Sequence, residues 1–205
     1  MRDITTLPSP WDAAPLLLRR LVNEAQTWRI EVGRPHRRRR TQLVKKDSLQ
    51  TAVRLAALGQ DCVAILVLFD ADDDCPKELA PILEQWAREA AGGKPCAVVM
   101  AHREYEAWFL ASIEALRGTA AILPDATSHP DPEAPRDAKG ELDLRMPRGA
   151  SYSPTVDQAS LTALLDLESA YRRCRSFRKL VSAFGELVAD AGVAPAVWPP
   201  ATWVA

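Results

Sequence analysis

The sequence predicts an α/β fold with a parallel-sheet core, flanking helices and a helical C-terminal extension. Two apolar runs, residues 63–69 and 96–101, are rich in branched side chains and show no alternation with polar residues. Such runs are typical of strands that are buried on both faces of a parallel sheet. Each run is followed by a segment of helical periodicity, and this order of strand and helix is the pattern of right-handed crossovers.

The first part of the chain supplies further elements of this layer. Apolar residues recur at helical spacing over residues 12–26, with Asp12 as the expected N-cap. The segment TWRIEV, residues 27–32, alternates and predicts a short strand. A second helix is expected over residues 48–58, and Gly59 is expected to end it.

The next elements complete a predicted α/β domain over residues 1–118. Pro76 suits the first position of a helix, and that helix is expected to end at Gly92 and Gly93. The segment 103–118 predicts a helix that follows the second buried strand.

The C-terminal part of the chain has a different character. Residues 119–154 are rich in proline, acids and small residues and predict a linker or insert that is a loop or partly disordered. Residues 155–205 predict a helical region that packs on the core. The prolines in the tail exclude a long regular helix there, and we expect Trp198 or Trp203 to pack back on the body.

Composition narrows the class of protein. The formal net charge is -1, so any attraction to nucleic acid must come from local clusters rather than from the whole chain. The four cysteines are dispersed, without a metal-binding spacing, which favours a reducing cytoplasm. No apolar leader opens the sequence and no run is long enough to cross a bilayer, so we expect a cytoplasmic protein without a membrane partner.

Acidic residues crowd together directly after the first buried run. Asp70 and Asp72 are two positions apart, and Asp73 and Asp74 follow at once. If the backbone is extended, residues at i and i+2 point to one side, so one hard cation could be bound by both carboxylates. The alternative is a solvated acidic loop at the start of a helix, which is favourable without any metal.

A second acidic pair follows the second buried run. Glu104 and Glu106 are expected at the same sheet edge, because the carboxyl ends of parallel strands lie together. Oxygen ligands favour Mg²⁺ or Mn²⁺. The alternative is that both are first-turn helix acids paired with Arg103, and His102 is expected to be structural rather than a ligand. The candidate catalytic residues are Asp70, Asp72, Glu104 and Glu106, and the candidate metal ligands are Asp70, Asp72, Asp74 and Glu106.

A run of arginines provides a candidate nucleic-acid contact. The segment RPHRRRR offers guanidinium groups to a phosphate backbone. The alternatives are a solvated loop or a contact with an acidic partner. The candidate residues are Arg37, Arg38, Arg39 and Arg40.

Two stretches together resemble a known bacterial family. LVLFDADDDCP and VVMAHREYEAWFLASIEALRG, with SYSPTVDQASLTALLDLESAYRRCRSFRKLVSAFGEL further on, look like the TOPRIM-like proteins grouped as domain of unknown function 4276. The resemblance covers nearly the whole chain. It implies a TOPRIM fold related to overcoming-lysogenization-defect nucleases, with Mg²⁺ held by acids that match Asp70 and Asp72, and with a second metal aided by an acid matching Glu104 or Glu106. It also implies an ATPase partner in defence against phage.

The chain departs from this family at its start. Family members usually open with an apolar strand that ends in Glu-Gly, whereas MRDITTLPSPWD holds no glutamate and has two prolines. Either the first strand is missing, or the strand is present and its acid has been lost, with Asp12 as the nearest substitute. The sequence therefore predicts a metal-dependent nuclease or nuclease subunit. The alternative is a catalytically degenerate interaction protein, and a homodimer is expected as one form of assembly.

Overall fold

The core of the molecule is a parallel sheet with the strand order β2-β1-β3-β4. The computed structural model describes residues 2–9, 13–119, 122–193, 195 and 197–204. The strands are β1 (Asp3–Ser9), β2 (Glu31–Val32), β3 (Cys62–Asp70) and β4 (Cys96–Ala101). The predicted α/β class with a parallel sheet is therefore confirmed.

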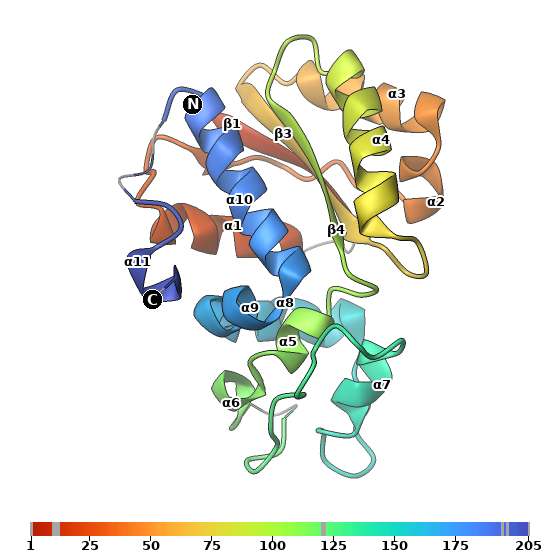
Figure 1. Cartoon of the computed structure of the whole chain (residues 1–205), viewed down its shortest axis with the longest axis vertical. Coiled ribbons are helices and arrows are strands. Elements are labelled where there is room, and N and C mark those ends of the chain that lie inside the picture. The colour runs from red at the N-terminus through yellow and green to blue at the C-terminus, as the bar shows by residue number, and fades with distance from the viewer. Residues whose placement is uncertain (1, 10–12, 120–121, 194, 196, 205) are drawn as a thin grey trace.

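Helices cover both faces of this sheet and its carboxyl end (Figure 1). In the first part of the chain they are α1 (Ala13–Glu24), α2 (Arg40–Leu43), α3 (Lys46–Ala57), α4 (Pro76–Ala90), α5 (Ala107–Leu110) and α6 (Ile113–Leu116). In the rest they are α7 (Ala138–Asp143), α8 (Pro154–Leu164), α9 (Leu167–Arg173), α10 (Arg175–Asp190) and α11 (Ala201–Val204).

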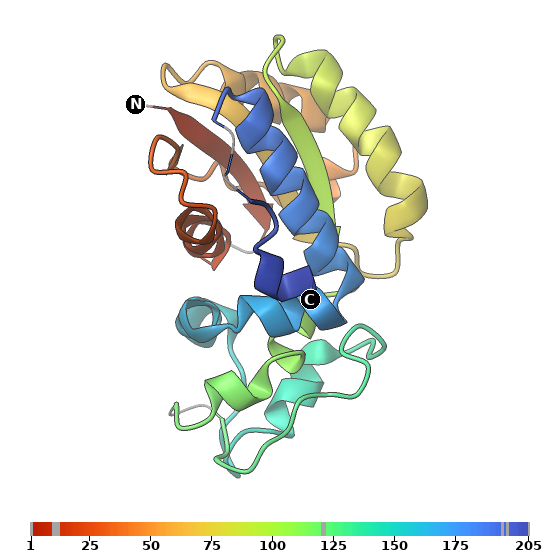
Figure 2. The ribbon, with the colours of Figure 1, turned by 60° about the vertical axis from the view of Figure 1, so that its left-hand side comes forward.

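The side chains of β3 enter two different cores, as its continuous apolar run predicts. Ala64, Leu66 and Leu68 belong to a cluster that includes α1 and α10. The alternate residues Ile65 and Val67 belong to a cluster that includes α3 and α4. Figure 2 shows α10, in blue, lying across one face of the sheet, while α4, in yellow-green, lies on the other side of β4. Burial on both faces explains why the strand lacks polar alternation.

The first strand is present, so the alternative in which it is missing is wrong. β1 pairs along its whole length with β3, and Pro8 lies opposite Leu68. The carbonyls of Ile4 and Thr6 accept hydrogen bonds from residues that follow β2. Because alternate residues of a strand face the same neighbour, the backbone nitrogen of Pro8 also faces the side of β2. β2 is only two residues long and does not extend as far as Pro8, so no hydrogen bond between strands is lost there. The proline is therefore compatible with an inner strand.

The predicted helix over residues 103–118 is two short helices. The chain turns after β4, with Arg103 in the left-handed region at φ 60°, and α5 begins only at Ala107. Between α5 and α6, the Ile113 amide donates to the Ser128 hydroxyl at 2.9 Å, and the insert thus replaces a bond within the helix. Local periodicity could not reveal this competition, because Ser128 lies outside the helical segment.

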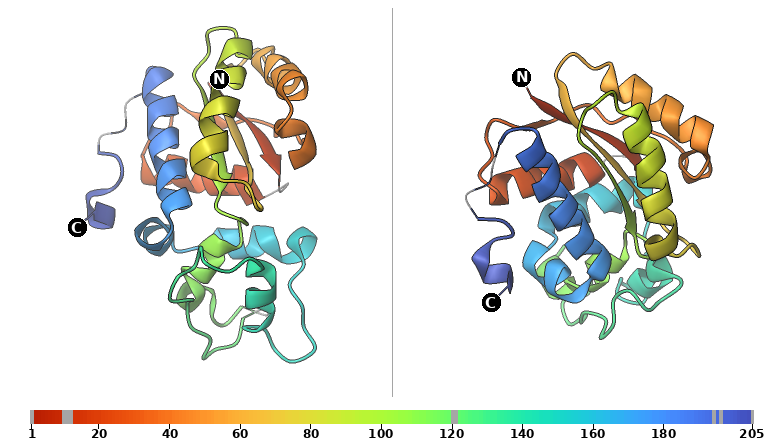
Figure 3. Two further views of the ribbon diagram at one scale, coloured as in Figure 1. Left: turned by 45° about the vertical axis from the view of Figure 1, so that its right-hand side comes forward. Right: turned by 45° about the horizontal axis from the view of Figure 1, so that its top comes forward.

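The proline-rich insert is mostly irregular but packs on the protein. It contains α7 and buries Ile122, Leu142 and Tyr152. Figure 3 shows the insert beyond the carboxyl end of the strands, next to α5.

The C-terminal region is helical and contributes to the core on the α10 face. In the tail, the Trp198 indole donates to the Val181 carbonyl at 2.7 Å and Trp203 is buried, so both tryptophans pack on the body. Within the described ranges, no helix combines the length and apolarity needed to cross a bilayer. Asp12, the predicted cap, lies outside the described residues.

Candidate functional site

The topology of the sheet indicates that a ligand would bind at the carboxyl ends of β1 and β3. The crossover from β1 to β2 runs through α1 on one face, and the crossover from β3 to β4 runs through α4 on the other. The strand order therefore reverses between β1 and β3. Open α/β sheets bind ligands at such a switch point, and Asp70 is the last residue of β3.

Asp70 is held in place and is reluctant to ionise. Its Oδ1 accepts a hydrogen bond from the Tyr105 amide at 2.8 Å. Burial, followed by repulsion from Glu106, raises the pKa of Asp70 well above its ordinary value, although Lys139 and the amide bond act in the opposite direction. The Lys139 ammonium interacts favourably with both Asp70 and Glu106.

Glu106 is a fully buried carboxylate whose two oxygens differ in their surroundings. Its Oε1 accepts from the Tyr152 hydroxyl at 2.8 Å and from the Gln158 amide at 3.0 Å. Its Oε2 lies 3.4 Å from the Lys139 ammonium and has no hydrogen-bond donor among the described residues. A buried carboxylate oxygen without a hydrogen-bond donor is costly, and the ion pair with Lys139 offsets part of that cost.

Glu104 closes the cluster from the insert side. Its Oε2 accepts from the Ala138 amide at 2.7 Å, at the N-terminus of α7, and its Oε1 forms an ion pair with Lys139. Burial alone lowers the pKa of Lys139, but Glu106 and Glu104 outweigh it and raise that pKa to about 12. Lys139 therefore stays protonated and offsets part of the negative charge of the two glutamates.

Asp72 and Asp74 face a different cation. Arg40 Nε lies 3.0 Å from Asp72 Oδ2, and Arg40 also forms an ion pair with Asp74. The same guanidinium donates to the carbonyls of Asp70 and Ala71, at 3.1 Å each. Because β3 ends at Asp70 and Asp72 has φ 50°, the backbone is not extended at this Asp-x-Asp pair, contrary to the prediction. The assumption that both carboxylates point to one side therefore does not hold.

Lysine and arginine side chains of the protein thus reduce the repulsion between the acids, and that repulsion was the basis of the metal hypothesis. Arg40 pairs with Asp72 and Asp74, and Lys139 pairs with Glu104 and Glu106, so each cation offsets part of the charge of two acids. Arg136 lies 3.7 Å from the exposed Asp73. Among the residues that the structure describes, no three histidine, cysteine or acidic side chains are placed to hold one metal ion. Asp70 and Glu106 remain as a pair of carboxylates that repel each other.

Two other arginines of the run, Arg38 and Arg39, form no ion pair with these acids among the described residues. Arg38 donates to the Arg37 carbonyl at 2.8 Å, and Arg39 directly precedes α2. A contact of the run with phosphate stays a prediction.

Several residues of the site could not be found from the sequence. These residues, which come from the insert and from α8, are Lys139, 35 positions from Glu104, and Tyr152 and Gln158, 46 and 52 positions from Glu106. No motif marks them, because a lysine in a proline-rich segment is ordinarily a surface residue. The fold alone brings them to the carboxyl edge of the sheet.

The comparison with protein families gives one match. The family described as a domain of unknown function, DUF4276, matches residues 12–184. The chain belongs to the DUF4276 family. The matched region, residues 12–184, includes Asp70, Glu106 and Lys139. Neither a search of curated proteins nor a search of solved structures found a significant match.

Proposed function

We propose that this DUF4276 protein is a TOPRIM-like nuclease, or a nuclease subunit, that depends on Mg²⁺ or Mn²⁺ bound by Asp70 and Glu106. The observation that carries the proposal is the unsatisfied Glu106 Oε2, buried beside a second carboxylate at the switch point of a parallel sheet. The sequence resemblance supports the same reaction class, and an ATPase partner in phage defence is part of this proposal.

The residues around the pair prepare it for a cation. Tyr152 and Gln158 fix the orientation of Glu106, and the Tyr105 amide fixes Asp70. A cation held by Asp70 and Glu106 would favour release of a proton from Asp70, and Lys139 would keep its ion pair with Glu104. A bound divalent cation would stabilise charge on a phosphodiester and lower the pKa of an attacking water.

The proposal is tested by metal binding and cleavage in parallel. We expect calorimetry with Mn²⁺ to show one site whose affinity falls at least tenfold in Asp70→Asn and in Glu106→Gln. Because a proton leaves on binding, the affinity of the wild type should rise with pH, by up to about tenfold per unit. Plasmid nicking or RNA cleavage with Mg²⁺ or Mn²⁺ should disappear in both variants. The matched control is Asp73→Asn, which changes an exposed acid outside the pair.

The second candidate is a non-catalytic, TOPRIM-like interaction protein that docks on an ATPase. It is favoured by Arg40, which binds Asp72 and Asp74, and by the end of β1, which reads Leu7-Pro8-Ser9 without an acid. If the protein is non-catalytic, neither Mg²⁺ nor Mn²⁺ supports cleavage by the wild type. Cleavage by the wild type that is lost in Asp70→Asn would contradict this second candidate.

A further inference from the structure

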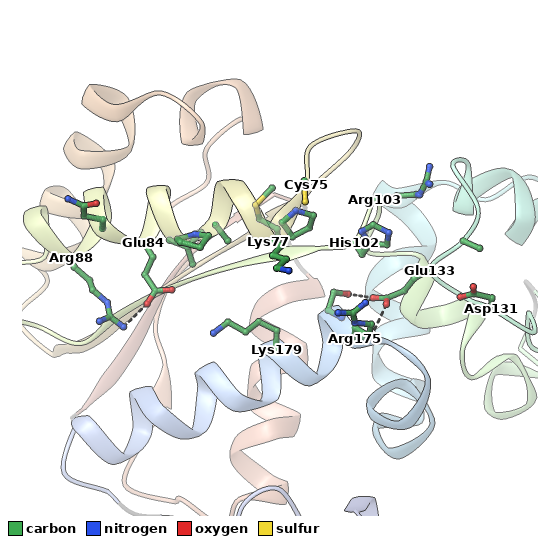
Figure 4. Close-up of a pocket in the computed structure, with 18 of the residues that line it drawn as sticks. Cys75, Lys77, Glu84, Arg88, His102, Arg103, Asp131, Glu133, Arg175 and Lys179 are labelled. Atoms are coloured by element: carbon green, nitrogen blue, oxygen red, sulfur yellow. Dashed lines mark hydrogen bonds and ion pairs between the residues drawn. The ribbon is translucent and has the colours of Figure 1, made fainter.

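A long groove lies between α4 and α10, beside β4 (Figure 4). Its volume is about 1410 Å³, larger than the roughly 300–1,000 Å³ of ordinary small-molecule pockets. The lining residues of α4 run from Pro76 to Glu89, which at about 1.5 Å per residue gives a wall about 20 Å long. The groove therefore has room for a segment of a macromolecule.

The accessible surface of this groove is formed by its walls. Val98 and Met100 at the bottom are 0% and 3% exposed, so they offer a ligand little surface. The side chains of Lys77 on α4 and Lys179 on α10 are exposed and project into the gap between the helices (Figure 4). A ligand of the groove is therefore held by side chains of the helices and not by the edge of the sheet.

The walls of the groove carry cations without acidic partners. Neither Lys77 nor Lys179 forms an ion pair among the described residues, and the same is true of Arg103 at the end of the groove. The Arg103 Nε is buried and has no hydrogen-bond acceptor there. Several cations of one sign along a groove attract a ligand with several negative charges.

Most of the acids in the lining are already engaged. Glu84 binds Arg88 at 2.5 Å, and Glu89 lies 3.4 Å from Lys46. Glu133 accepts from the backbone amides at the start of α10. The free charge that faces the groove is therefore mostly positive.

One end of the groove lies near the candidate cation site. His102 and Arg103, which line the groove, directly follow β4, and Glu104 is the next residue. The Arg103 carbonyl accepts a hydrogen bond from the Asp72 amide at 2.9 Å. The end of the groove thus lies at the same sheet edge as the Asp70–Glu106 pair.

The width of the groove follows from the layers that form it. α10 and α4 pack on opposite faces of β4, since Val99 belongs to the cluster on the α10 side and Val98 to the cluster on the α4 side. Because packed layers lie about 10 Å apart, the two helix axes are about 20 Å apart. A helix with its side chains is about 10–12 Å wide, so about 10 Å remains between the helix surfaces. A B-form duplex, whose major groove alone is about 12 Å wide, is too broad for this gap, whereas one extended chain fits.

Two kinds of extended polyanion have these dimensions. An extended acidic peptide is ordinarily bound through its backbone at a free sheet edge, and the residues of β4 beneath this groove are buried. A nucleic-acid strand carries a phosphate at every residue and is held by side-chain cations, and its exposed bases stack on aromatic rings. The half-buried His102 provides such a ring at the end of the groove. The lining therefore favours a nucleic-acid strand.

We propose that the groove binds single-stranded nucleic acid and leads it toward the Asp70–Glu106 pair. Lys77 and Lys179 contact phosphates from the two walls. Arg103 contacts a phosphate at the end nearest the pair, and the His102 ring stacks on a base. The role of the groove rests on the proposed function, and it narrows the substrate of that nuclease to single strands.

The test measures the fluorescence anisotropy of a labelled thymidine oligonucleotide in EDTA. We expect Lys77→Gln/Lys179→Gln to bind it at least tenfold more weakly than the wild type. The slope of log affinity against log salt concentration should fall by about 1.4, because each phosphate contact to a single strand contributes about 0.7. The matched control is Arg29→Gln/Arg148→Gln, which removes the same charge from exposed sites outside the groove and should bind as the wild type does.

Stacking on His102 has a separate readout. His102→Phe keeps an aromatic ring and should bind the oligonucleotide as the wild type does, whereas His102→Ala should bind about fivefold more weakly or worse. Equal binding by the lysine variant and its control, equal loss in the two His102 variants, or no binding by the wild type would overturn the proposal. So would equal or tighter binding of the matching duplex, or of a polyglutamate peptide of equal charge.

Binding in EDTA also separates the groove from the nuclease proposal, because no divalent cation is present. Binding that depends on the two lysines, without cleavage under either metal, would contradict the nuclease alone. Cleavage that Lys77→Gln/Lys179→Gln leaves unchanged would contradict the role of the groove alone.

Discussion

At the scale of single residues, the central feature is an acid that folding makes harder to ionise. Asp70 is buried beside Glu106, and this raises its pKa above the ordinary value of 3.8. The folded chain therefore keeps a proton at pH values where the unfolded chain has lost it. The contribution of Asp70 to stability is complete below about pH 3.8 and is lost as pH rises toward the pKa of the folded state.

Replacement of Asp70 by asparagine should restore the stability that the protein loses as pH rises. Asparagine keeps the acceptor for the Tyr105 amide and carries no charge. We expect Asp70→Asn to raise the free energy of unfolding at pH 8 by about 1–3 kcal/mol, with a gain that shrinks toward pH 4. Urea denaturation at several pH values measures it, and Asp73→Asn serves as the control. Parallel pH profiles for wild type and Asp70→Asn would show that the proton is not held there.

The sequence could mark Asp70 and Glu106 as candidates but could not predict their partners. Acids after two buried strands are visible as a pattern, and parallel pairing brings Asp70 to the same edge as the chain after β4. Arg40 and Lys139 are invisible as partners, because 30 or more positions separate them from the acids they bind. The conformation of Asp72 was also hidden, since the point where a strand ends depends on the tertiary structure.

At the scale of elements, one glutamate of the insert anchors the longest helix. Glu133 accepts from the Arg175 and Ser176 amides at 2.8 and 2.9 Å, and the Ser176 hydroxyl accepts from the Trp108 indole at 2.8 Å. The insert, α10 and α5 are thus joined at one point. A carboxylate at a helix N-terminus is favoured both by hydrogen bonding and by the helix dipole.

We expect Glu133→Gln to lower the free energy of unfolding by about 1–2 kcal/mol and to expose the insert to limited proteolysis. The control is Glu168→Gln, which removes an exposed pair with Arg172 and should cost less than about 0.5 kcal/mol. Equal effects from the two variants, measured by guanidinium denaturation, would show that the anchor adds nothing beyond a surface charge.

The elements themselves were largely predictable, and their boundaries were less so. β3, β4 and the start of α4 at Pro76 follow from continuous apolar runs and from the chemistry of proline. β1 was not predicted, because its two threonines and Pro8 weaken the apolar pattern of an inner strand. Pairing with β3 overrides that weak local preference.

At the scale of the whole molecule, one face of the sheet is completed by the end of the chain. The cluster on the α10 face joins Leu66 and Leu68 of β3 to Phe177, Leu180 and Phe184 of α10. A fragment that ends at residue 118 would leave this face uncovered.

We therefore expect the fragment 1–118 to aggregate or to melt without cooperativity, and co-expression with residues 119–205 to restore a soluble complex. Size-exclusion chromatography and thermal circular dichroism measure both outcomes. A monomeric fragment with a cooperative transition would show that residues 1–118 form an independent domain.

The inner position of β1 has a consequence for biosynthesis. Its neighbours on the two sides are β2 and β3, and the register joins Asp3 to Glu31 and Ser9 to Phe69. During synthesis β1 is made well before β3, so Ile4 and Leu7, which the finished sheet buries, stay exposed until β3 has been made. During that interval β1 is a target for chaperones that bind apolar segments of nascent chains.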